Sequence, residues 1–257
     1  MRYLVYILSC CLLLACHSDN NTLTVGTIDG PETELVESAK TVLEKAHHIK
    51  LKIVPFYDYN IPNQALAEGD LDINVFQHLP YLQASIEAHG YPLEVVGKTF
   101  IYPTGIYSQK IHTLDALPEN ARIAIPNDPS NEARALILLE SSGLITLSSH
   151  KQITPKDISE NPHHLDIIEI DAAQLPRILP DVDAAVINTT FAIPAGLIPT
   201  KDAIFLEGKD SPYANLIVAK QDSPKQVEIQ YFVEAMHSPE VLERAKILFG
   251  PSAIPAW

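Results

Sequence analysis

Short apolar runs rich in β-branched residues alternate along the chain with longer amphipathic stretches. This alternation predicts strands followed by helices, which is the pattern of an α/β protein. The expected strands are residues 23–27, 49–56, 72–76, 122–126, 165–170, 184–187 and 203–206. The expected helices are residues 32–47, 78–89, 131–141, 172–179, 189–195, 225–236 and 239–249.

Two long, mostly apolar stretches, 93–107 and 213–219, interrupt this alternation. A chain that leaves one half and later returns to it predicts two α/β lobes, one inserted into the other. We expect residues 23–105 and 220–257 to form the first lobe. Residues 106–219 then form the second lobe, with the return crossing at their end. A hinge of this kind places a cleft between the lobes, where small ligands usually bind.

The first fifteen residues have the features of an export signal. Arg2 precedes a run that is purely apolar or small. About a dozen apolar residues form a helix of roughly 18 Å, too short for the ~30 Å core of a bilayer. The run ends Leu13-Leu14-Ala15-Cys16, which resembles the lipobox of bacterial lipoproteins. This resemblance implies removal of residues 1–15 and attachment of lipid to Cys16, within a polar tether that reaches residue 22. The alternative is a buried hydrophobic helix of the domain.

Charge and cysteine content narrow the possible functions. The 257 residues are 46% hydrophobic, which is enough for lobes with real cores. Lys and Arg number 18 against 32 Asp and Glu, a net charge of −14. Such a surface repels a nucleic-acid backbone, because that binding depends on Lys and Arg. The three cysteines are Cys10, Cys11 and Cys16, so the residues after Cys16 form no disulfide and supply no cysteine nucleophile.

Sequence motifs of common enzyme classes are missing. Gly97-Lys98-Thr99 looks like the end of a phosphate-binding loop, but Pro92 stands where that loop needs its first glycine. The chain contains neither a Gly-x-Ser-x-Gly turn nor a His-Glu-x-x-His helix. We therefore expect no catalytic residues, no cofactor and no enzymatic activity.

Two pairs of adjacent histidines, His47-His48 and His163-His164, raise the alternative of zinc import. Adjacent side chains point about 100° apart on a helix and to opposite faces of a strand, so one pair rarely supplies two ligands to one metal ion. We interpret both pairs as solvated surface histidines and expect no metal site.

Seven short blocks follow one another in order along the chain. They are Asp58-Tyr59 with Pro62-Asn63, then residues 74–81 (NVFQHLPY), 99–103 (TFIYP), 126–134 (PNDPSNEAR), 174–177 (QLPR), 186–190 (VINTT) and 211–216 (SPYANL). Together the blocks resemble the methionine-binding lipoproteins of bacterial ABC importers, the NlpA-type family, over nearly the whole chain after the leader. The resemblance implies a two-lobed periplasmic-binding-protein fold of type 2. It also implies a monomer that captures methionine, L or D, and delivers it to a membrane permease and its ATPase.

The resemblance further implies that Arg134, Asn188 and Asn215 hold the backbone of an amino-acid ligand. A buried zwitterion needs a partner for each charge. A guanidinium binds a carboxylate through two hydrogen bonds, and a carboxamide accepts from an ammonium or donates to a carboxylate. Arg134 could instead pair with Glu132 or Glu140 on a helix surface, and Asn188 could be only a helix N-cap. Asn215 is expected within an apolar strand, where a buried amide needs partners.

Tyr59, Phe76, His78 and Tyr81 are expected to enclose the side chain of the ligand. Phe76 and His78 fall on one face of an extended segment, and Tyr81 lies one helical turn further. Aromatic rings suit a methionine tail, because each sulfur–aromatic contact contributes roughly 0.3–1.5 kcal/mol. The alternative is that Phe76 is a core residue and that His78 caps a helix. Tyr102, on the outgoing crossing, could line the cleft or pack the hinge.

Three hypotheses follow for the function. The first is a lipid-tethered receptor for methionine that lies on the periplasmic or outer face of a membrane without spanning it. The second keeps the fold but changes the ligand to a methionine dipeptide or another amino acid. The third is an adhesion or scaffold lipoprotein with no transport ligand. His17 stands where an Asp would retain a Gram-negative lipoprotein at the inner membrane, so the inner and the outer membrane both stay open.

Overall fold

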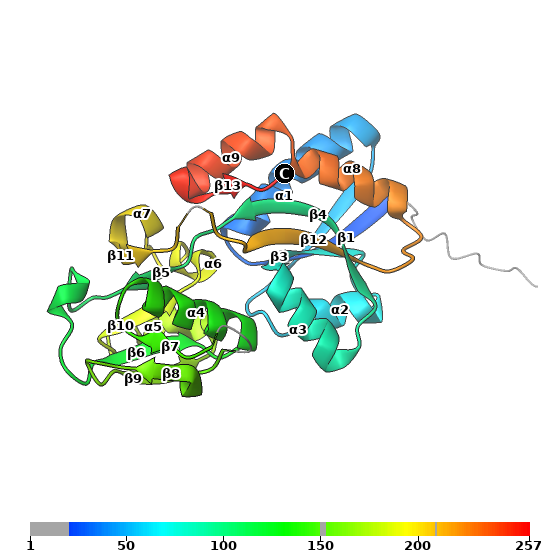
Figure 1. Cartoon of the computed structure of the whole chain (residues 1–257). Coiled ribbons are helices and arrows are strands. Elements are labelled where there is room, and N and C mark those ends of the chain that lie inside the picture. The colour runs from blue at the N-terminus through cyan, green and yellow to red at the C-terminus, as the bar shows by residue number, and fades with distance from the viewer. Residues whose placement is uncertain (1–20, 150–152, 209) are drawn as a thin grey trace, which may run out of the picture.

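The computed structural model describes residues 21–149, 153–208 and 210–257. Two separate β-sheets, each flanked by helices, form two lobes that two chain segments connect (Figure 1). The expected α/β fold of two lobes is therefore confirmed. The expected signal sequence, Cys16 and the tether up to residue 20 lie outside the described residues. Within the described ranges, no helix is both long enough and apolar enough to cross a bilayer.

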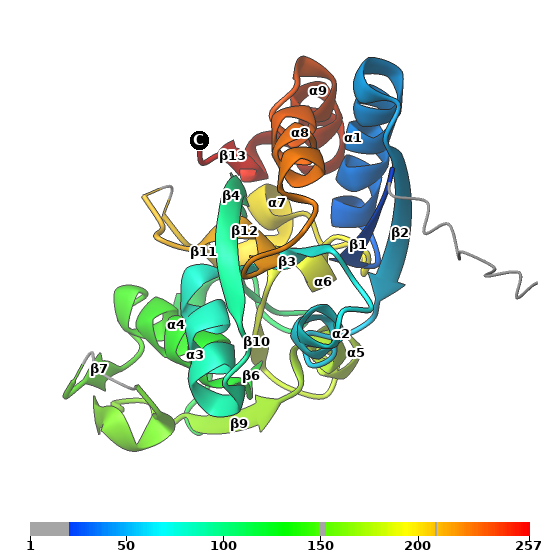
Figure 2. The same ribbon diagram turned by 90° about the vertical axis from the view of Figure 1, so that its right-hand side faces the viewer.

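The first lobe is built on a six-stranded sheet. Its strands, in spatial order, are β13 (Ile254–Pro255), β4 (Leu93–Ile101), β12 (Ala214–Lys220), β3 (Ile73–His78), β1 (Thr22–Ile28) and β2 (Lys50–Phe56). β1 runs parallel to β2 and β3, whereas β12 is antiparallel to β3 and β4. The helices that cover the two faces (Figure 2) are α1 (Pro31–His47), α8 (Gln226–Met236) and α9 (Pro239–Phe249) on one, and α2 (Pro62–Glu68) and α3 (Leu79–His89) on the other.

The second lobe is built on a five-stranded sheet. Its strands, in spatial order, are β11 (Ala203–Leu206), β5 (Gly105–Tyr107), β10 (Ala184–Ile187), β6 (Arg122–Pro126) and β9 (Asp166–Ile170). β9 and β10 run parallel to β6, whereas β5 is antiparallel to β10 and β11. The helices of this lobe are α4 (Pro129–Ser141), α5 (Leu175–Ile178), α6 (Thr189–Ala192) and α7 (Pro199–Asp202). β7 (Thr146–Leu147) and β8 (Ile158–Glu160) pair in a small ribbon.

The two crossings differ from their expected form. The outgoing stretch consists of β4 in the first sheet and β5 in the second, and the chain passes between the lobes at residues 102–104. The expected return crossing is β12, which lies between β3 and β4, so it belongs to the first lobe instead of the second. Residues 215–219 are buried because this strand has a neighbour on each side. A continuous apolar run fits a central strand as well as a crossing.

Several helices also differ from their expected bounds. The segment expected as one helix at 172–179 is a 3₁₀ turn (Ala172–Gln174) followed by α5, and α6 ends at Ala192 instead of residue 195. α4 begins two residues early because the Asp128 side chain accepts from the backbone N–H of Asn131 and so caps the helix. α2 and α7 are too short to show a hydrophobic period, and the sequence pattern did not predict them.

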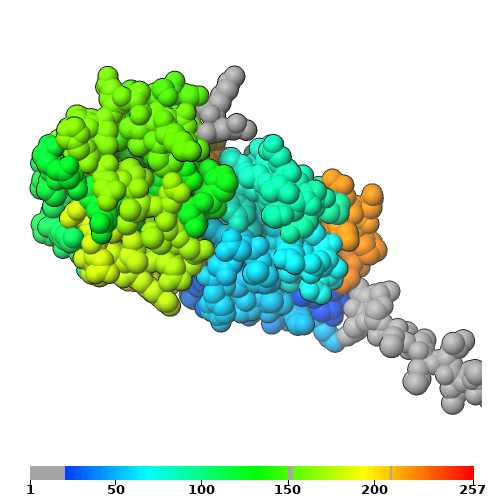
Figure 3. All heavy atoms as spheres, turned by 90° about the horizontal axis from the view of Figure 1, so that it is seen from below, coloured from blue at the N-terminus to red at the C-terminus, as the bar shows by residue number. Residues whose placement is uncertain are grey.

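The fold brings the carboxyl ends of parallel strands to the boundary between the lobes. β1 lies between β2 and β3, and β6 lies between β9 and β10. In open α/β sheets a ligand crevice forms at such a point, outside the carboxyl ends of the strands, where the strand order reverses. Figure 3 shows the two lobes against each other, the second in green and yellow and the first in blue and cyan.

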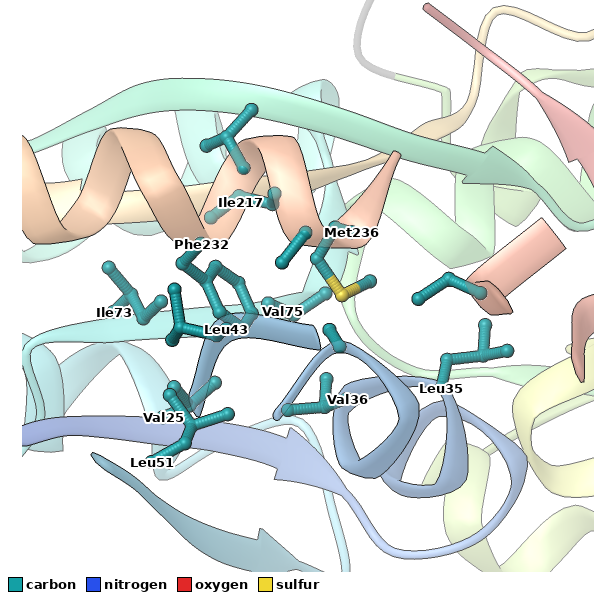
Figure 4. Packing of buried hydrophobic residues seen from close by; sticks show 14 of the residues in the cluster. Val25, Leu35, Val36, Leu43, Leu51, Ile73, Val75, Ile217, Phe232 and Met236 are labelled. Carbon is teal, nitrogen blue, oxygen red and sulfur yellow. The ribbon is translucent and has the colours of Figure 1, made fainter. Parts of the chain in front are cut away.

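The largest core lies between the first sheet and helices α1, α8 and α9. Phe232 of α8 is fully buried in it, together with Leu43 of α1 and with Ile73 and Val75 of β3 (Figure 4). Val227 lies on the same helix but is 62% exposed. α8 therefore has one face in the core and one in solvent.

Replacing Phe232 by Ala removes a large ring from this core and leaves a cavity. We expect the free energy of unfolding to fall by about 3–5 kcal/mol, measured by urea denaturation. Val227→Ala, on the exposed face of the same helix, is the control and should change it by less than about 0.5 kcal/mol. Equal effects of the two substitutions would contradict this assignment of the core.

Candidate functional site

A cavity lies between the two lobes and is lined by side chains of both. The seven residues that we expected to bind a ligand all line it. They are Tyr59, Phe76, His78, Tyr81, Arg134, Asn188 and Asn215. Five further residues complete the wall: Gln77, Tyr102, Asn131, Thr189 and Thr190. The fold thus brings together side chains that are up to 156 positions apart (59 to 215), and their binding of a ligand stays a prediction.

Three aromatic rings of the first lobe form one side of the cavity. The ring centroids of Tyr59, Phe76 and Tyr81 lie 5.7–5.9 Å from one another, and Phe191 of the second lobe lies 4.8 Å from Tyr59. The Tyr81 hydroxyl donates to the backbone oxygen of Tyr59 at 2.7 Å, which holds the two rings together. Burial raises the pKa of both tyrosines above the ordinary value. This side of the cavity is therefore uncharged and suits an apolar tail.

His78 ends β3 and caps α3, and it also lines the cavity. Its Nδ1 accepts from the backbone N–H of Tyr81 at 3.3 Å, so the proton of the neutral ring is on Nε2. Nε2 lies 3.2 Å from Oδ1 of Asn131 in the second lobe. Burial, together with the nearby charge of Arg134, lowers the pKa of His78 to about 3. His78 is therefore neutral and connects the two lobes.

A chain of hydrogen bonds sets the orientation of Asn188. Asn131 Nδ2 donates to both carboxylate oxygens of Asp128, at 3.1 and 3.0 Å. Asn131 Oδ1 must therefore accept, and it does so from Nδ2 of Asn188 at 2.8 Å. Asn188 Oδ1 is buried and has no hydrogen-bond partner among the described residues. Asn188 occupies the N-cap position of α6 but makes no capping bond with its side chain, so it presents an open acceptor.

Asn215 lies opposite His78 in the pairing of β12 with β3. Its Nδ2 donates to Oε1 of Glu32 at 2.5 Å, and no residue that the structure describes donates to its Oδ1. Glu32 is in the first turn of α1 and is buried. Burial raises its pKa to about 8, against a smaller lowering by the hydrogen bond from Asn215. The amide of Asn215 is thus oriented by a carboxyl group behind it.

Arg134 projects from α4 and is 4% exposed. Its Nε and Nη2 donate to the carboxylate oxygens of Glu207 at 3.0 and 2.5 Å, and Nη2 also donates to the backbone oxygen of Tyr102 at 3.0 Å. The guanidinium carbon lies 4.2 Å from the centre of the Tyr213 ring, a cation–π contact. Glu207 and Tyr102 lie on the two segments that connect the lobes. Within the described ranges Nη1 makes no hydrogen bond, so one nitrogen stays open for an anion.

Gln77 lines the cavity, but its amide is already satisfied. Its Oε1 accepts from Nδ2 of Asn63 at 2.8 Å, and its Nε2 donates to Oδ1 of Asn63 and of Asn74 at 2.6 and 3.0 Å. These buried amides attach α2 to β3. Gln77 therefore supports the wall and is not an open polar group.

Sequence reasoning did not identify two residues that organise the site. Asn131 is within one of the seven blocks, but its role depends on contacts with His78 and Asn188 that only the fold brings about. Glu207 lies outside every block and 73 positions from Arg134. Arg134 therefore pairs with Glu207 and not with Glu132 or Glu140, the helix neighbours that spacing alone suggested.

Tyr102 both lines the cavity and packs at the hinge, where its ring lies 4.6 Å from that of Phe249.

The histidine pairs lie away from this cavity. His47 stacks on Tyr231 with ring centroids 3.8 Å apart, and Nδ1 of His163 lies 3.2 Å from Oε1 of Glu119. Residues 21–149, 153–208 and 210–257 contain no group of three His, Cys, Asp or Glu side chains that could hold a metal ion.

The neutral state of His78 makes stability depend on pH. An unfolded histidine titrates near pH 6.5, whereas folded His78 has its pKa lowered to about 3. Between these values the unfolded chain binds a proton that the native protein excludes, so the free energy of unfolding falls as the pH is lowered. We expect wild type to lose up to about 1.4 kcal/mol per pH unit more than His78→Gln between pH 6 and pH 4, by urea denaturation. Equal slopes for the two proteins would contradict a neutral His78.

Proteins of related sequence are known. A family model described as NlpA lipoprotein matches residues 23–257. The D-methionine-binding lipoprotein MetQ of Salmonella typhi is 46% identical over 243 residues, which cover 93% of this chain and 90% of that protein. Lipoprotein 28 of Escherichia coli K12 is 43% identical over 244 residues, with the same coverage of 93% and 90%.

Solved structures of related proteins have the same fold. An ABC transporter periplasmic substrate-binding protein from Coxiella burnetii is 53% identical, with a TM-score of 0.89 and coverage of 91% of this chain and 100% of that one. A nutrient-binding protein from Burkholderia cenocepacia, bound to methionine, is 46% identical, with the same TM-score of 0.89 and the same coverage of 91% and 100%. The resemblance found in the seven sequence blocks is confirmed, and the chain belongs to the NlpA lipoprotein family.

Proposed function

We propose that this protein is the lipid-anchored substrate-binding protein of an ABC importer and that it captures methionine, L or D, for delivery to the membrane permease. The observation that carries the proposal is the cavity between the lobes, which combines an aromatic wall, a guanidinium and two open amide oxygens. A free amino acid needs these three kinds of partner once it is buried. The D-methionine-binding relatives and the methionine-bound protein from Burkholderia cenocepacia support the choice of ligand.

The polar end of the ligand is held by charges and dipoles of fixed direction. Its carboxylate accepts a charge-assisted hydrogen bond from Nη1 of Arg134. Its ammonium donates to Oδ1 of Asn188 and Oδ1 of Asn215. The reverse orientation is unfavourable, because it would place the ligand ammonium beside the like charge of the Arg134 guanidinium.

The side chain of the ligand lies against the rings of Tyr59, Phe76 and Tyr81. A thioether is polarizable and flexible, so it fits an irregular slot between aromatic rings and gains from sulfur–ring contacts. The neutral ring of His78 also lines the cavity, with its centroid 5.0 Å from that of Tyr213. A carboxylate side chain would find no partner among these rings.

Binding and closure are coupled because the ligand contacts both lobes. A closed arrangement binds the ligand more tightly than an open one, and the ligand therefore raises its population. The permease, with its ATPase, recognises the closed monomer and receives the ligand chemically unchanged. A lipid on Cys16 keeps the protein on the periplasmic or outer face of a membrane.

Thermal unfolding of the full chain with different ligands separates the hypotheses. A ligand at 100 times its Kd adds about 2.7 kcal/mol of stability, so methionine should raise the midpoint clearly. We compare L-methionine, D-methionine and a methionine dipeptide. Stronger stabilisation by the dipeptide would show that the dipeptide, and not methionine, is the preferred ligand. No stabilisation by any of the three compounds would favour an adhesion or scaffold lipoprotein.

Replacing Asn215 by Ala removes one of the two oxygens that accept from the ligand ammonium. A hydrogen bond to a charged group contributes about 1.5–3 kcal/mol, so we expect methionine affinity to fall roughly 10- to 100-fold in isothermal titration calorimetry. Gln64→Ala, an exposed amide on α2, is the control and should bind as wild type does. Unchanged affinity of Asn215→Ala would refute the site.

A further inference from the structure

Glu32 is a buried carboxyl group that has no countercharge in the described part of the chain. It is 3% exposed, in the first turn of α1. One oxygen, Oε1, accepts from Asn215, but Oε2 is buried and has no hydrogen-bond partner in the described part of the chain. No lysine, arginine or histidine among the described residues forms an ion pair with it. Buried carboxyl groups of this kind are costly unless a partner satisfies them.

The turn that carries Glu32 lies close to the second lobe. Gly30, between β1 and α1, has a φ of +129°, which side-chain-bearing residues rarely adopt, and a Cβ there would lie 3.1 Å from Cγ of Pro194. This close approach brings the start of α1 to the edge of the cleft. Burial raises the pKa of Tyr59 and Tyr102, two residues of the cavity wall, and the charge of Glu32 raises each of them further.

Asn215 connects Glu32 with the cavity. Its Nδ2 donates to Glu32. Among the described residues, no donor binds its Oδ1 or Oδ1 of Asn188. A cation that binds these two oxygens is separated from the Glu32 carboxylate only by the side-chain amide of Asn215. In a buried, weakly screened environment the attraction across that distance is considerable. The cationic group of the proposed ligand is its α-ammonium.

We propose that Glu32 is the countercharge for the amine of the ligand, so that the site selects an α-amino acid over the matching carboxylic acid that lacks the amine. The inference rests on the proposed function. Burial favours the neutral form of the Glu32 carboxyl when the cavity is empty, and an ammonium in the cavity favours the ionised form. Arg134 recognises the carboxylate in both classes of compound, whereas Glu32 distinguishes between them.

Glu32→Gln separates this role from a purely structural one. Glutamine keeps an oxygen that accepts from Nδ2 of Asn215, so the amide keeps its orientation while the charge is lost. The variant should fold, because a neutral amide is easier to bury than an unpaired carboxyl group. Glu34→Gln removes the same charge from the same helical turn, where the side chain is exposed and pairs with Arg244. It is the matched control.

The test is isothermal titration calorimetry of the full chain with methionine and with its desamino analogue, γ-(methylthio)butyric acid. We expect Glu32→Gln to reduce the preference for methionine over the analogue by about tenfold or more, through weaker methionine binding. Glu34→Gln should keep the wild-type preference.

Each other outcome overturns the inference. An unchanged preference means that the charge of Glu32 does not act on the amine. Equal weakening of both compounds, or a Glu32→Gln chain that fails to fold, means that the residue is only structural. If wild type binds no methionine, the proposed function fails and the inference with it. If wild type binds methionine tightly but Glu32→Gln keeps the wild-type preference, the Glu32 proposal is wrong and the proposed function stands.

Discussion

The orientation of two carboxamides is the constraint on which the site depends. An amide has a donor end and an acceptor end, and a buried one cannot be reversed without leaving groups unsatisfied. Asp128 orients Asn131, which in turn orients Asn188, and Glu32 orients Asn215. Among the residues that the structure describes, no donor binds the side-chain oxygen of either asparagine, and Nη1 of Arg134 has no acceptor. The cavity therefore has a positive and a negative end, as the proposed binding of a zwitterion requires.

The hinge is part of the same arrangement. Arg134 donates to Tyr102 on the outgoing segment and to Glu207 on the returning one. Thr104 and Glu207 also exchange backbone and side-chain hydrogen bonds, at 2.9 and 3.2 Å. A guanidinium that binds both connecting segments cannot move independently of either. In the proposed function, recognition of the ligand carboxylate and closure of the lobes therefore depend on one side chain.

Sequence alone predicted much of the fold and the members of the site, but not the contacts between them. Strands such as β1 and β6 and helices such as α1 and α9 follow from local periodicity. β12 was misplaced because its apolar run fits a crossing and a central strand equally well. The Arg134–Glu207 pair joins residues 73 positions apart, and the Asp128–Asn131–Asn188 chain joins the ends of β6 and β10. Such contacts depend on which strands are neighbours, which local patterns do not specify.

The most direct test of the account is a crystal structure of the full chain with methionine bound. We expect the carboxylate within hydrogen-bond distance of Nη1 of Arg134, the ammonium against Oδ1 of Asn188 and Oδ1 of Asn215, and the thioether among the rings of the first lobe. Methionine bound in the opposite orientation, with its ammonium beside the guanidinium, or bound in a different cavity, would contradict the account.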